Sequence, residues 1–364
     1  MEKFAFILHP LTAKDFGRKF PITKNWPEGL IEGIAKYIPP FKVSHITGIE
    51  SPLAQSEGWF IVCPLTSRQM MEMPEQYVIK KIIKAGKIAE QLGAKVLGLG
   101  AFTSIVGDAG ITIAENLNIP VTTGNSYTVA TALEGTRQAA KIMGINMEKA
   151  NVVILGATGS IGAACAQILS REVRYLTLAA RNETKLEKLA EQILRSTGLA
   201  ARVTANTKSA LKAADIVIAV TSAVDSIIEP EDLKSGAIVC DVARPRNVSR
   251  RVAEMRNDIL VIEGGVVEVP GAVDFGFNFG FPPGTAYACM AETMILALEQ
   301  RYENFTLGRD LTMRQVETIT QLAQKHHFKL SGFRSFERAI TPEELAIIKT
   351  NIADKIENKR RIIS

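Results

Sequence analysis

One cysteine near the start of a predicted helix is the side chain best suited to covalent chemistry. Thr285 is a natural N-cap, and the helix-forming run after it makes Cys289 the fourth helical residue. The N–H groups of a first helical turn and the helix dipole favour a thiolate there. A thiolate near a nicotinamide can attack a thioester carbonyl, hold the acyl group and receive a hydride at that carbon. The alternative is packing, because a cysteine among Ala and Met residues usually belongs to a core.

The remaining cysteines and the histidines provide weaker candidates. Cys63 lies near a strand end and is the rival nucleophile, whereas Cys165 and Cys240 fall where packing explains them. The four cysteines form no C-x-x-C pair, so the usual spacing of a structural zinc site is absent. Adjacent His326 and His327 would point about 100° apart on a helix, and cannot clamp one metal ion together. We expect no metal site.

A glycine-rich turn predicts a second kind of chemistry, the binding of a dinucleotide. An apolar strand at residues 151–156 leads into the glycines and then into a helix. The first glycine permits the tight turn, the second lets a pyrophosphate approach the backbone, and the third lets helix and strand pack closely. The helix N-terminus offers N–H groups to the phosphates. The candidate cofactor-binding residues of this turn are Gly156, Thr158, Gly159, Ser160, Ile161 and Gly162.

The next strand favours NADPH over NADH. Arg181 and Asn182 follow its tip, with no acidic residue to hold a ribose 2′-hydroxyl. A basic tip, with Lys185 nearby, suits a 2′-phosphate instead; the alternative is that Arg181 is a solvated surface residue. Three further residues complete the candidate set. Thr221 and Ser222 are small polar residues at a later strand tip, and Gly265 would let the nicotinamide lie close to the backbone.

Alternating apolar and amphipathic segments predict an α/β fold with parallel sheets. Strands are expected at residues 4–8, 42–47, 59–64, 96–100, 120–122, 151–156, 175–180, 216–220, 238–242 and 260–262. Helices are expected at residues 73–93, 107–117, 125–143, 160–171, 183–196, 286–301, 312–328 and 342–358.

This order of elements predicts two α/β lobes, one of them a Rossmann NADP-binding domain. We expect an N-terminal substrate lobe at residues 1–124, then a connector helix and the Rossmann domain at residues 125–284. C-terminal helices at residues 285–364 would carry Cys289 and pack back on an earlier lobe. The connector helix ends at Gly144 as a C′ residue.

Composition excludes several classes of protein. The chain has 364 residues, 46% of them hydrophobic, which is enough for a sizeable core and argues against disorder. The formal charge of +5 is mild and scattered, and aromatic residues are only 6%, so we expect no nucleic-acid binding. No apolar run reaches transmembrane length, and residues 4–8 are too short for a signal peptide. A cytoplasmic enzyme is therefore expected.

Six segments, in order, resemble the long-chain acyl-[acyl-carrier-protein] reductases. They are LGLGAFTSI at residues 97–105, TTGNSYTVA at 122–130, VILGATGSIG at 153–162, GGVVE at 264–268, ACMAETM at 288–294 and NFTLGR at 304–309. The resemblance implies NADPH-dependent reduction of a fatty acyl thioester to a fatty aldehyde, with Cys289 as the acyl acceptor. It implies an acyl carrier protein or coenzyme A thioester as substrate, and an aldehyde-consuming enzyme as a further partner.

The resemblance is uneven along the chain. Residues 1–57 match weakly, the tail after about residue 335 is an apparent extension, and Tyr127 occupies the family's aromatic or imidazole position. Residues 241–247, DVARPRN, are closer to the shikimate dehydrogenase and glutamyl-tRNA reductase superfamily. The acyl chain length and the carrier therefore stay open.

Two groups of residues, one at the start of the connector helix and one in the first lobe, are candidates for substrate binding. Asn125, Tyr127 and the helix N-terminus at Gly124 are candidate donors to the carbonyl oxygen, although simple capping explains Asn125 equally well. Phe102, Thr103 and Ser104 follow a strand, at the edge where ligands of open α/β sheets bind.

A phenylalanine-rich segment allows two interpretations. Phe275, Phe277, Phe279 and Phe281 alternate with small residues. They could line an apolar channel for a long acyl chain, or belong to a half-buried extended segment with a period of two.

Three alternatives to the reductase stay open. A shikimate-type alcohol or ketone dehydrogenase would need a Lys–Asp pair, for which Lys81 and Asp108 are poor candidates. A relative of glutamyl-tRNA reductase would use Cys63 as nucleophile. A non-catalytic NADP-binding regulator would bind nucleotide and turn over no thioester.

Overall fold

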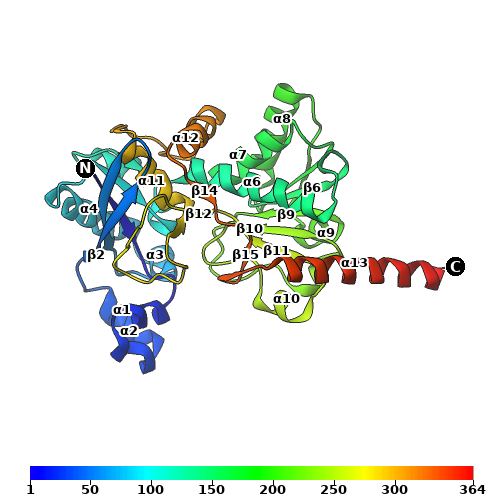
Figure 1. Cartoon of the computed structure of the whole chain (residues 1–364), viewed down its shortest axis with the longest axis horizontal. Coiled ribbons are helices and arrows are strands. Elements are labelled where there is room, and N and C mark those ends of the chain that lie inside the picture. Colours follow the sequence, from blue (N-terminus) through cyan, green and yellow to red (C-terminus); the bar gives the residue numbers. More distant parts are fainter. Residues whose placement is uncertain (364) are drawn as a thin grey trace. The chain divides into compact units, whose positions relative to one another are not determined.

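The computed structural model describes residues 1–363 and confirms the expected α/β class (Figure 1). The chain forms two compact units, each assembled from two separate stretches. Unit 1 comprises Met1–Thr128 and Val266–Ser331, and unit 2 comprises Val129–Gly265 and the chain from Gly332 onward. The helices after residue 285 are thus shared between the units and do not form a segment of their own. The chain passes from unit 1 to unit 2 within helix α6 (Asn125–Met143).

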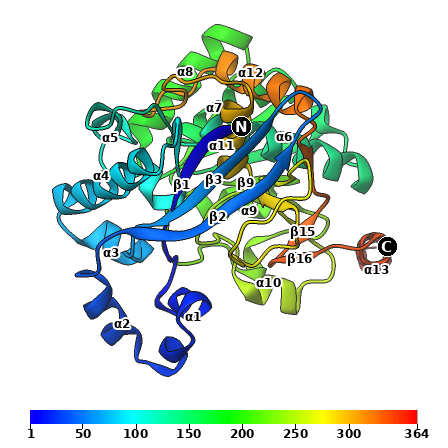
Figure 2. The same ribbon diagram turned by 60° about the vertical axis from the view of Figure 1, so that its left-hand side comes forward.

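Unit 1 is built on a five-stranded sheet in the order β2-β3-β1-β4-β5, part of which is visible in Figure 2. Its strands are β1 (Glu2–Leu8), β2 (Phe41–Glu50), β3 (Gln55–Val62), β4 (Val96–Leu99) and β5 (Val121–Thr122). All are mutually parallel except β2, which pairs antiparallel with β3. Because the carboxyl ends of parallel strands share one edge, residues that follow β1, β4 and β5 gather there.

Helix α11 (Ala288–Leu298) packs on β1 and β4 of this sheet. Every residue of α11 is buried except Cys289, as expected of a helix that is apolar almost all round. A Cβ on Gly98 of β4 would lie less than 3.0 Å from the Thr293 hydroxyl, so this glycine gives α11 the room to approach. The other helices of unit 1 are α1 (Phe16–Lys19), α2 (Glu28–Ala35), α3 (Ser67–Glu72), α4 (Glu75–Gln91), α5 (Ile111–Glu115) and α12 (Met313–Lys325).

Unit 2 has a fully parallel six-stranded sheet in the order β11-β10-β9-β6-β7-β8. Its strands are β6 (Asn151–Leu155), β7 (Tyr175–Ala179), β8 (Arg202–Thr204), β9 (Ile216–Ala219), β10 (Ile238–Asp241) and β11 (Leu260–Glu263). Numbered within the unit, this is the 3-2-1-4-5-6 order of a doubly wound dinucleotide-binding sheet, whose switch point lies between its first and fourth strands. Here that point lies between β6 and β9, so the expected Rossmann architecture is confirmed.

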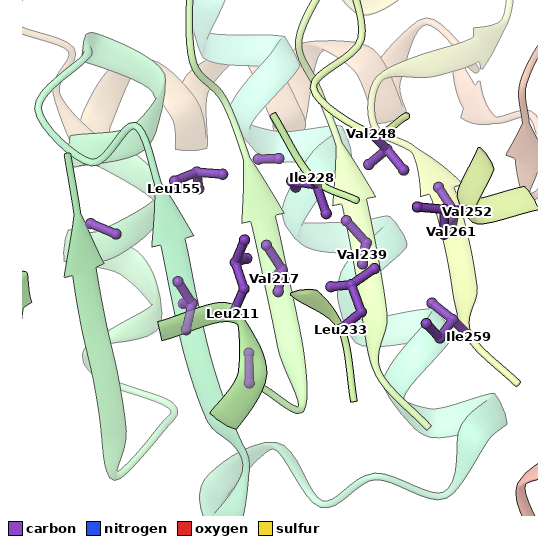
Figure 3. Packing of buried hydrophobic residues seen from close by; sticks show 14 residues of the cluster. Leu155, Leu211, Val217, Ile228, Leu233, Val239, Val248, Val252, Ile259 and Val261 are labelled. Carbon is purple, nitrogen blue, oxygen red and sulfur yellow. The ribbon is translucent and has the colours of Figure 1, made fainter. Parts of the chain in front are cut away.

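One hydrophobic cluster packs on one face of this second sheet. Figure 3 shows Leu155, Val217, Val239 and Val261 on neighbouring strands, together with Leu211 and Val252 from two helices of the same cluster. The helices of unit 2 beyond α6 are α7 (Ser160–Leu169), α8 (Glu183–Thr197), α9 (Thr207–Ala213), α10 (Arg250–Met255) and α13 (Pro342–Ile363). No helix among the described residues is long and apolar enough to cross a membrane.

Two expectations about helices are wrong. The helix expected at residues 107–117 shrinks to α5, because Gly107, Ala109 and Gly110 all have positive φ angles of 56–93° that a right-handed helix cannot accept. Thr285 does not cap a helix, because β13 (Thr285–Tyr287) pairs with β12 (Val266–Glu268) in a small sheet that also contains β14 (Lys329–Leu330). Long-range strand pairing thus overrides the local N-cap signal.

Candidate functional site

Cys289 is the second residue of α11, closer to the helix N-terminus than the fourth position expected from sequence. Tyr287, with extended backbone angles of φ −66° and ψ 146°, is the N-cap. The N–H groups of a first turn lack intrahelical partners, and the positive end of the dipole lies there, so this position favours a thiolate. Since Cys289 is also the one residue of α11 that is not buried, packing alone does not account for it.

The other cysteines are sealed in the interior. Of the four cysteines, all of which the structure describes, only Cys289 is partly exposed. Burial raises the pKa of Cys63 to about 12 and that of Cys240 to about 12, and burial likewise raises the pKa of Cys165. These three side chains stay protonated at neutral pH and are poor nucleophiles.

Gly124 brings a second helix N-terminus against Cys289. Gly124 directly precedes α6 and has a φ of +74°, which favours glycine. A Cβ on Gly124 would lie less than 3.0 Å from both Cα and Cβ of Cys289. Helices α6 and α11 therefore begin close together at Cys289, and the positive end of the α11 dipole favours negative charge on a side chain of its first turn.

Glu292, which the sequence analysis did not single out, holds these two helix ends together. Its carboxylate is fully buried one turn after Cys289. One oxygen, Oε2, accepts hydrogen bonds from the Ser126 hydroxyl at 2.6 Å and the Tyr127 N–H at 2.9 Å. The other, Oε1, accepts from the hydroxyls of Thr122 and Thr306, the latter at 2.8 Å. A single charged residue within the apolar run of α11 was the available sequence signal.

The two predicted carbonyl-oxygen donors lie at the start of α6. Asn125 is its first residue and is half-buried, and the Tyr127 side chain is buried. The backbone N–H of Tyr127 donates to Glu292, so this N–H is not a donor to a substrate. The roles of Asn125, Tyr127 and the Gly124 end of the helix in substrate binding stay predictions.

The predicted substrate residues Phe102, Thr103 and Ser104 form a buried turn at the carboxyl end of β4. The Thr103 hydroxyl accepts from the Gly100 N–H at 2.9 Å and donates to its carbonyl at 2.8 Å, and the Ser104 hydroxyl donates to Ala101 O at 2.7 Å. These hydroxyls stabilise the turn itself, so substrate contact by their side chains stays a prediction.

His9, missed in the sequence, locks this turn to β1. Its Nε2 accepts the Phe102 N–H at 3.0 Å, which places the ring proton on Nδ1, where it donates to Pro10 O at 3.0 Å. Burial lowers the pKa of His9 to about 4, so the ring is neutral at pH 7. His9 therefore has a structural role here, and we do not propose it as a general acid or base.

The phenylalanine segment forms a row of rings that reaches the start of α11. Phe275 stacks on Phe60 of β3 with centroids 5.9 Å apart, and Phe279 lies edge-on to Phe275 at 5.1 Å. Phe281 continues the row and contacts the Tyr287 ring at 4.5 Å. Gly276 and Gly280, with φ of +58° and +99°, interrupt any regular extended segment. The row therefore connects the sheet of unit 1 to the residue that caps the helix of Cys289.

The glycine turn of unit 2 has the geometry its spacing predicted. Gly156 has a φ of +91°, and a Cβ there would lie 2.9 Å from Val220 O. A Cβ on Gly162 would lie less than 3.0 Å from Gly156 O, so this glycine allows the helix to pack on the turn. Gly159, by contrast, is exposed, and an added Cβ would meet only Gly156 O at 3.5 Å. The open space falls at the glycine where a pyrophosphate needs backbone access.

The remaining residues of that turn lie where a dinucleotide's phosphates need them. Thr158, Ser160 and Ile161 are half-buried around the N-terminus of α7, for which Gly159 is the N-cap. A dinucleotide bound here would meet N–H groups of the first turn of α7. The residues present therefore fit the cofactor that the motif implies.

The other cofactor candidates follow the carboxyl ends of strands in the same sheet. Arg181 and Asn182 are exposed after β7, and the Asn182 side chain accepts the Lys185 N–H at 2.9 Å, which makes it the N-cap of α8. Thr221 and Ser222 follow β9, across the switch point from the glycine turn. Gly265 is buried with a φ of +85° and follows the edge strand β11, so it is two strands further from β6 than Thr221 is.

Residues 241–247 brace this edge of the sheet. Buried Asp241 accepts the N–H groups of Val248 at 2.9 Å and Ala243 at 3.2 Å, and burial raises its pKa to about 6. Asn247 is buried and accepts the Thr221 N–H at 2.9 Å. This segment therefore fixes the loop after β9 rather than facing solvent.

Comparisons with known proteins relate the chain to a dehydrogenase family, two reductases and an aminotransferase. A family model described as Shikimate / quinate 5-dehydrogenase matches residues 137–262. Aminotransferase PigE of Serratia sp. is 31% identical over 363 residues, covering 95% of this chain and 42% of that protein. Long-chain acyl-[acyl-carrier-protein] reductase of Synechococcus elongatus is 28% identical over 332 residues, covering 87% and 94%. Glutamyl-tRNA reductase of Methanocaldococcus jannaschii is 31% identical over 119 residues, covering 32% and 29%.

These similarities differ in what they establish. The family model lies wholly within unit 2, and together with the glycine turn it confirms the expected nicotinamide dinucleotide-binding domain. The expected similarity to the acyl-carrier-protein reductases is confirmed as a distant one. The chain spans less than half the length of PigE. Among the described residues, no group of three His, Cys, Asp or Glu side chains is placed to hold a metal ion.

Replacing Gly124 by Ala should change the reactivity of the Cys289 thiol and leave the structure of unit 2 unchanged. The added methyl group clashes with the Cys289 backbone, so the thiol must shift. We expect the rate of Cys289 alkylation by iodoacetamide, followed by peptide mass spectrometry, to change severalfold. Gly144→Ala is the matched control, because Gly144 has a similar φ of +72° but nothing within 4 Å of the added Cβ. Equal effects of the two variants would contradict the proposed contact.

Removing the Glu292 carboxylate should destabilise unit 1. Glu292→Ala leaves four buried donors without their acceptor, which costs about 3–5 kcal/mol in the free energy of unfolding measured with urea. Glu292→Gln keeps the volume and one acceptor oxygen, so its loss should be smaller. Glu317→Ala, at an exposed position of α12, should change stability by less than about 0.5 kcal/mol. A Glu292→Ala variant as stable as the parent would refute this role.

Proposed function

We propose that the protein is an oxidoreductase that reduces a fatty acyl thioester to a fatty aldehyde with NADPH, through an acyl group held on Cys289. The observation that carries the proposal is the position of this thiol. It is the one partly exposed cysteine, it lies in the first turn of a buried helix, and a second helix begins against it. The distant similarity to a long-chain acyl-[acyl-carrier-protein] reductase supports the same chemistry.

The acyl transfer needs only groups of unit 1. The Cys289 thiolate attacks the carbonyl carbon of the substrate thioester, the bond from that carbon to the carrier sulfur breaks, and the carrier leaves as its thiol after taking up a proton. Asn125 and the start of α6 at Gly124 would donate to the oxygen on which negative charge develops. The aromatic row from Phe275 to Tyr287 would contact the apolar chain of the acyl group.

NADPH, when bound, would supply a hydride to the acyl carbon. For its part, Cys289 then leaves as the thiolate when its bond to that carbon breaks, which releases the aldehyde and restores the nucleophile. The start of α11 at Cys289 favours the anion both before the attack and after the release. In unit 2, the turn from Gly156 to Gly162 would hold the pyrophosphate and Arg181 the 2′-phosphate of NADPH.

Contacts in the structure argue against two of the alternatives. The Lys81 ammonium donates to Lys36 O at 2.6 Å and Ala35 O at 3.3 Å, and the Asp108 carboxylate accepts from Thr112. Lys81 thus binds the C-terminal end of α2, and Asp108 binds the start of α5. The two side chains do not form the Lys–Asp pair that a shikimate-type dehydrogenase would need. Cys63, the nucleophile of the tRNA-reductase alternative, is fully buried with a raised pKa.

The acyl intermediate can be trapped by omitting the reductant. Incubation with a long-chain acyl thioester should add the acyl mass to the Cys289 peptide, and NADPH should then remove it with the release of aldehyde. Cys289→Ala should lower the turnover rate by roughly a thousandfold or more. Cys63→Ala changes a buried cysteine and should leave the turnover rate unchanged. A label on Cys63, or no label on any cysteine, would overturn the mechanism. Binding of NADPH without any turnover would favour the regulator.

Arg181→Ala tests the choice of cofactor. Loss of a charged contact to the 2′-phosphate should raise the KM for NADPH by roughly tenfold or more and leave the KM for NADH unchanged. Arg195→Ala is the control. Arg195 is also an exposed arginine, but it lies in the last turn of α8, at the end of the helix away from Arg181. Equal changes for the two nucleotides would show that Arg181 does not read the phosphate.

A further inference from the structure

Helix α2 and its flanks expose an unusual amount of apolar surface. Six large apolar side chains between residues 20 and 37 are 39–78% exposed, namely Phe20, Ile22, Trp26, Leu30, Ile34 and Tyr37. Leu30 and Ile34 are one turn apart on α2, and Trp26 and Tyr37 lie just beyond its two ends. We call Trp26, Leu30, Ile34 and Tyr37 the apolar ridge. Figure 2 shows α1 and α2 projecting beyond the sheet of unit 1.

The opposite face of α2 is already packed, so the ridge has a fixed outward orientation. Ile31 and Ala35 form a small core with Ala13 and Phe16. At the end of the helix, Tyr77 and Lys81 each donate to Lys36 O at 2.6 Å. A helix that is apolar on both faces normally has both faces covered, and exposed apolar patches of this kind mark interaction surfaces.

The charges around the ridge are predominantly positive. Residues 13–38 contain five basic side chains, Lys14, Arg18, Lys19, Lys24 and Lys36, against three acidic ones, Asp15, Glu28 and Glu32. The acidic groups all have partners: Asp15 pairs with Arg18 at 3.3 Å, Glu28 with Lys14 at 3.7 Å, and Glu32 accepts from Thr66 at 2.8 Å. Lys24 precedes the ridge in the sequence, and Lys36 lies between Ile34 and Tyr37, with its ammonium 4.9 Å from the centre of the Tyr37 ring.

We propose that the apolar ridge seats the protein on an anionic lipid surface. Trp and Tyr with neighbouring Lys residues are the combination that prefers the boundary between headgroups and acyl chains, where lysines reach the phosphates and aromatic rings lie at headgroup level. The surface of α2 next to Leu30 and Ile34 is open, since a Cβ added at Gly29 or Gly33 would meet nothing within 4 Å. Protruding side chains can enter a fluid surface without a matching pocket, whereas a protein partner would have to supply one.

Trp26 provides a built-in reporter, because the chain has two tryptophans and Trp59 is 8% exposed and stacked on His45. In a Trp59→Phe background, Trp26 fluorescence should shift to the blue on addition of phosphatidylglycerol-containing vesicles, and brominated lipids should quench it. Phosphatidylcholine vesicles should give a weaker response, and added salt should weaken the response to anionic vesicles. This measurement does not depend on the proposed reaction.

Matched variants locate the contact. Leu30→Ser with Ile34→Ser should lower the vesicle partition coefficient by roughly tenfold or more, and Lys24→Glu with Lys36→Glu should abolish the preference for anionic lipid. Met255→Ser, at a 62% exposed position of α10 in unit 2, is the control and should bind as the parent does. All variants are checked for folding by circular dichroism.

Three results would overturn the proposal. The first is no change of Trp26 fluorescence with any vesicle, and the second is equal binding by the Leu30/Ile34 variant and the parent. The third is a stronger Trp26 response to an acidic carrier protein, or to rising protein concentration, than to anionic vesicles. That third result would assign the ridge to a protein partner or to a second copy of the chain.

Discussion

A single buried carboxylate organises the candidate site of unit 1. Glu292 satisfies a backbone N–H of α6 and three hydroxyls from separate parts of the chain, so it fixes the starts of α6 and α11 relative to each other. A buried charge is tolerated only when it is fully hydrogen-bonded, which makes this arrangement hard to alter piece by piece. Cys289 and Gly124 acquire their close contact within this frame.

The two units illustrate different ways of preparing a site for negative charge. In unit 2, one helix N-terminus and an open glycine at position 159 leave room for a diphosphate. In unit 1, the glycine before α6 lies against the backbone and Cβ of Cys289 in the first turn of α11, where a thiolate is favoured. The proposed lipid-facing ridge is another part of unit 1, where Lys81 and Tyr77 of α4 bind the end of α2. Its test is separate from that of the chemistry.

Much of the fold was predictable because local signals and tertiary structure agree there. The parallel strands of unit 2 are short apolar runs, and the glycine spacing marks the turn after β6 without ambiguity. The predictions of secondary structure were wrong where contacts with residues distant in the sequence, or unusual backbone angles, determine the conformation. Thr285 looks like an N-cap but pairs as a strand with Glu268. Residues 107–110 look helical, but Gly107, Ala109 and Gly110 take left-handed conformations. Short elements such as β12 and β14 exist only because they pair with each other across the sequence.

The amino-acid sequence by itself determined the α/β class, the dinucleotide turn and the choice of Cys289 as the candidate nucleophile, because these depend on residue types at short spacing. Tertiary structure alone decided which cysteines are sealed and which is reachable, since burial depends on residues far away in the chain. It also revealed the structural roles of Glu292 and His9. Glu292 binds Ser126 and Tyr127 at the start of α6, and His9 binds Phe102 in the turn after β4. Each of these partners lies at least 93 residues away in the sequence. A hydrogen bond over such a separation leaves no pattern that one sequence can reveal.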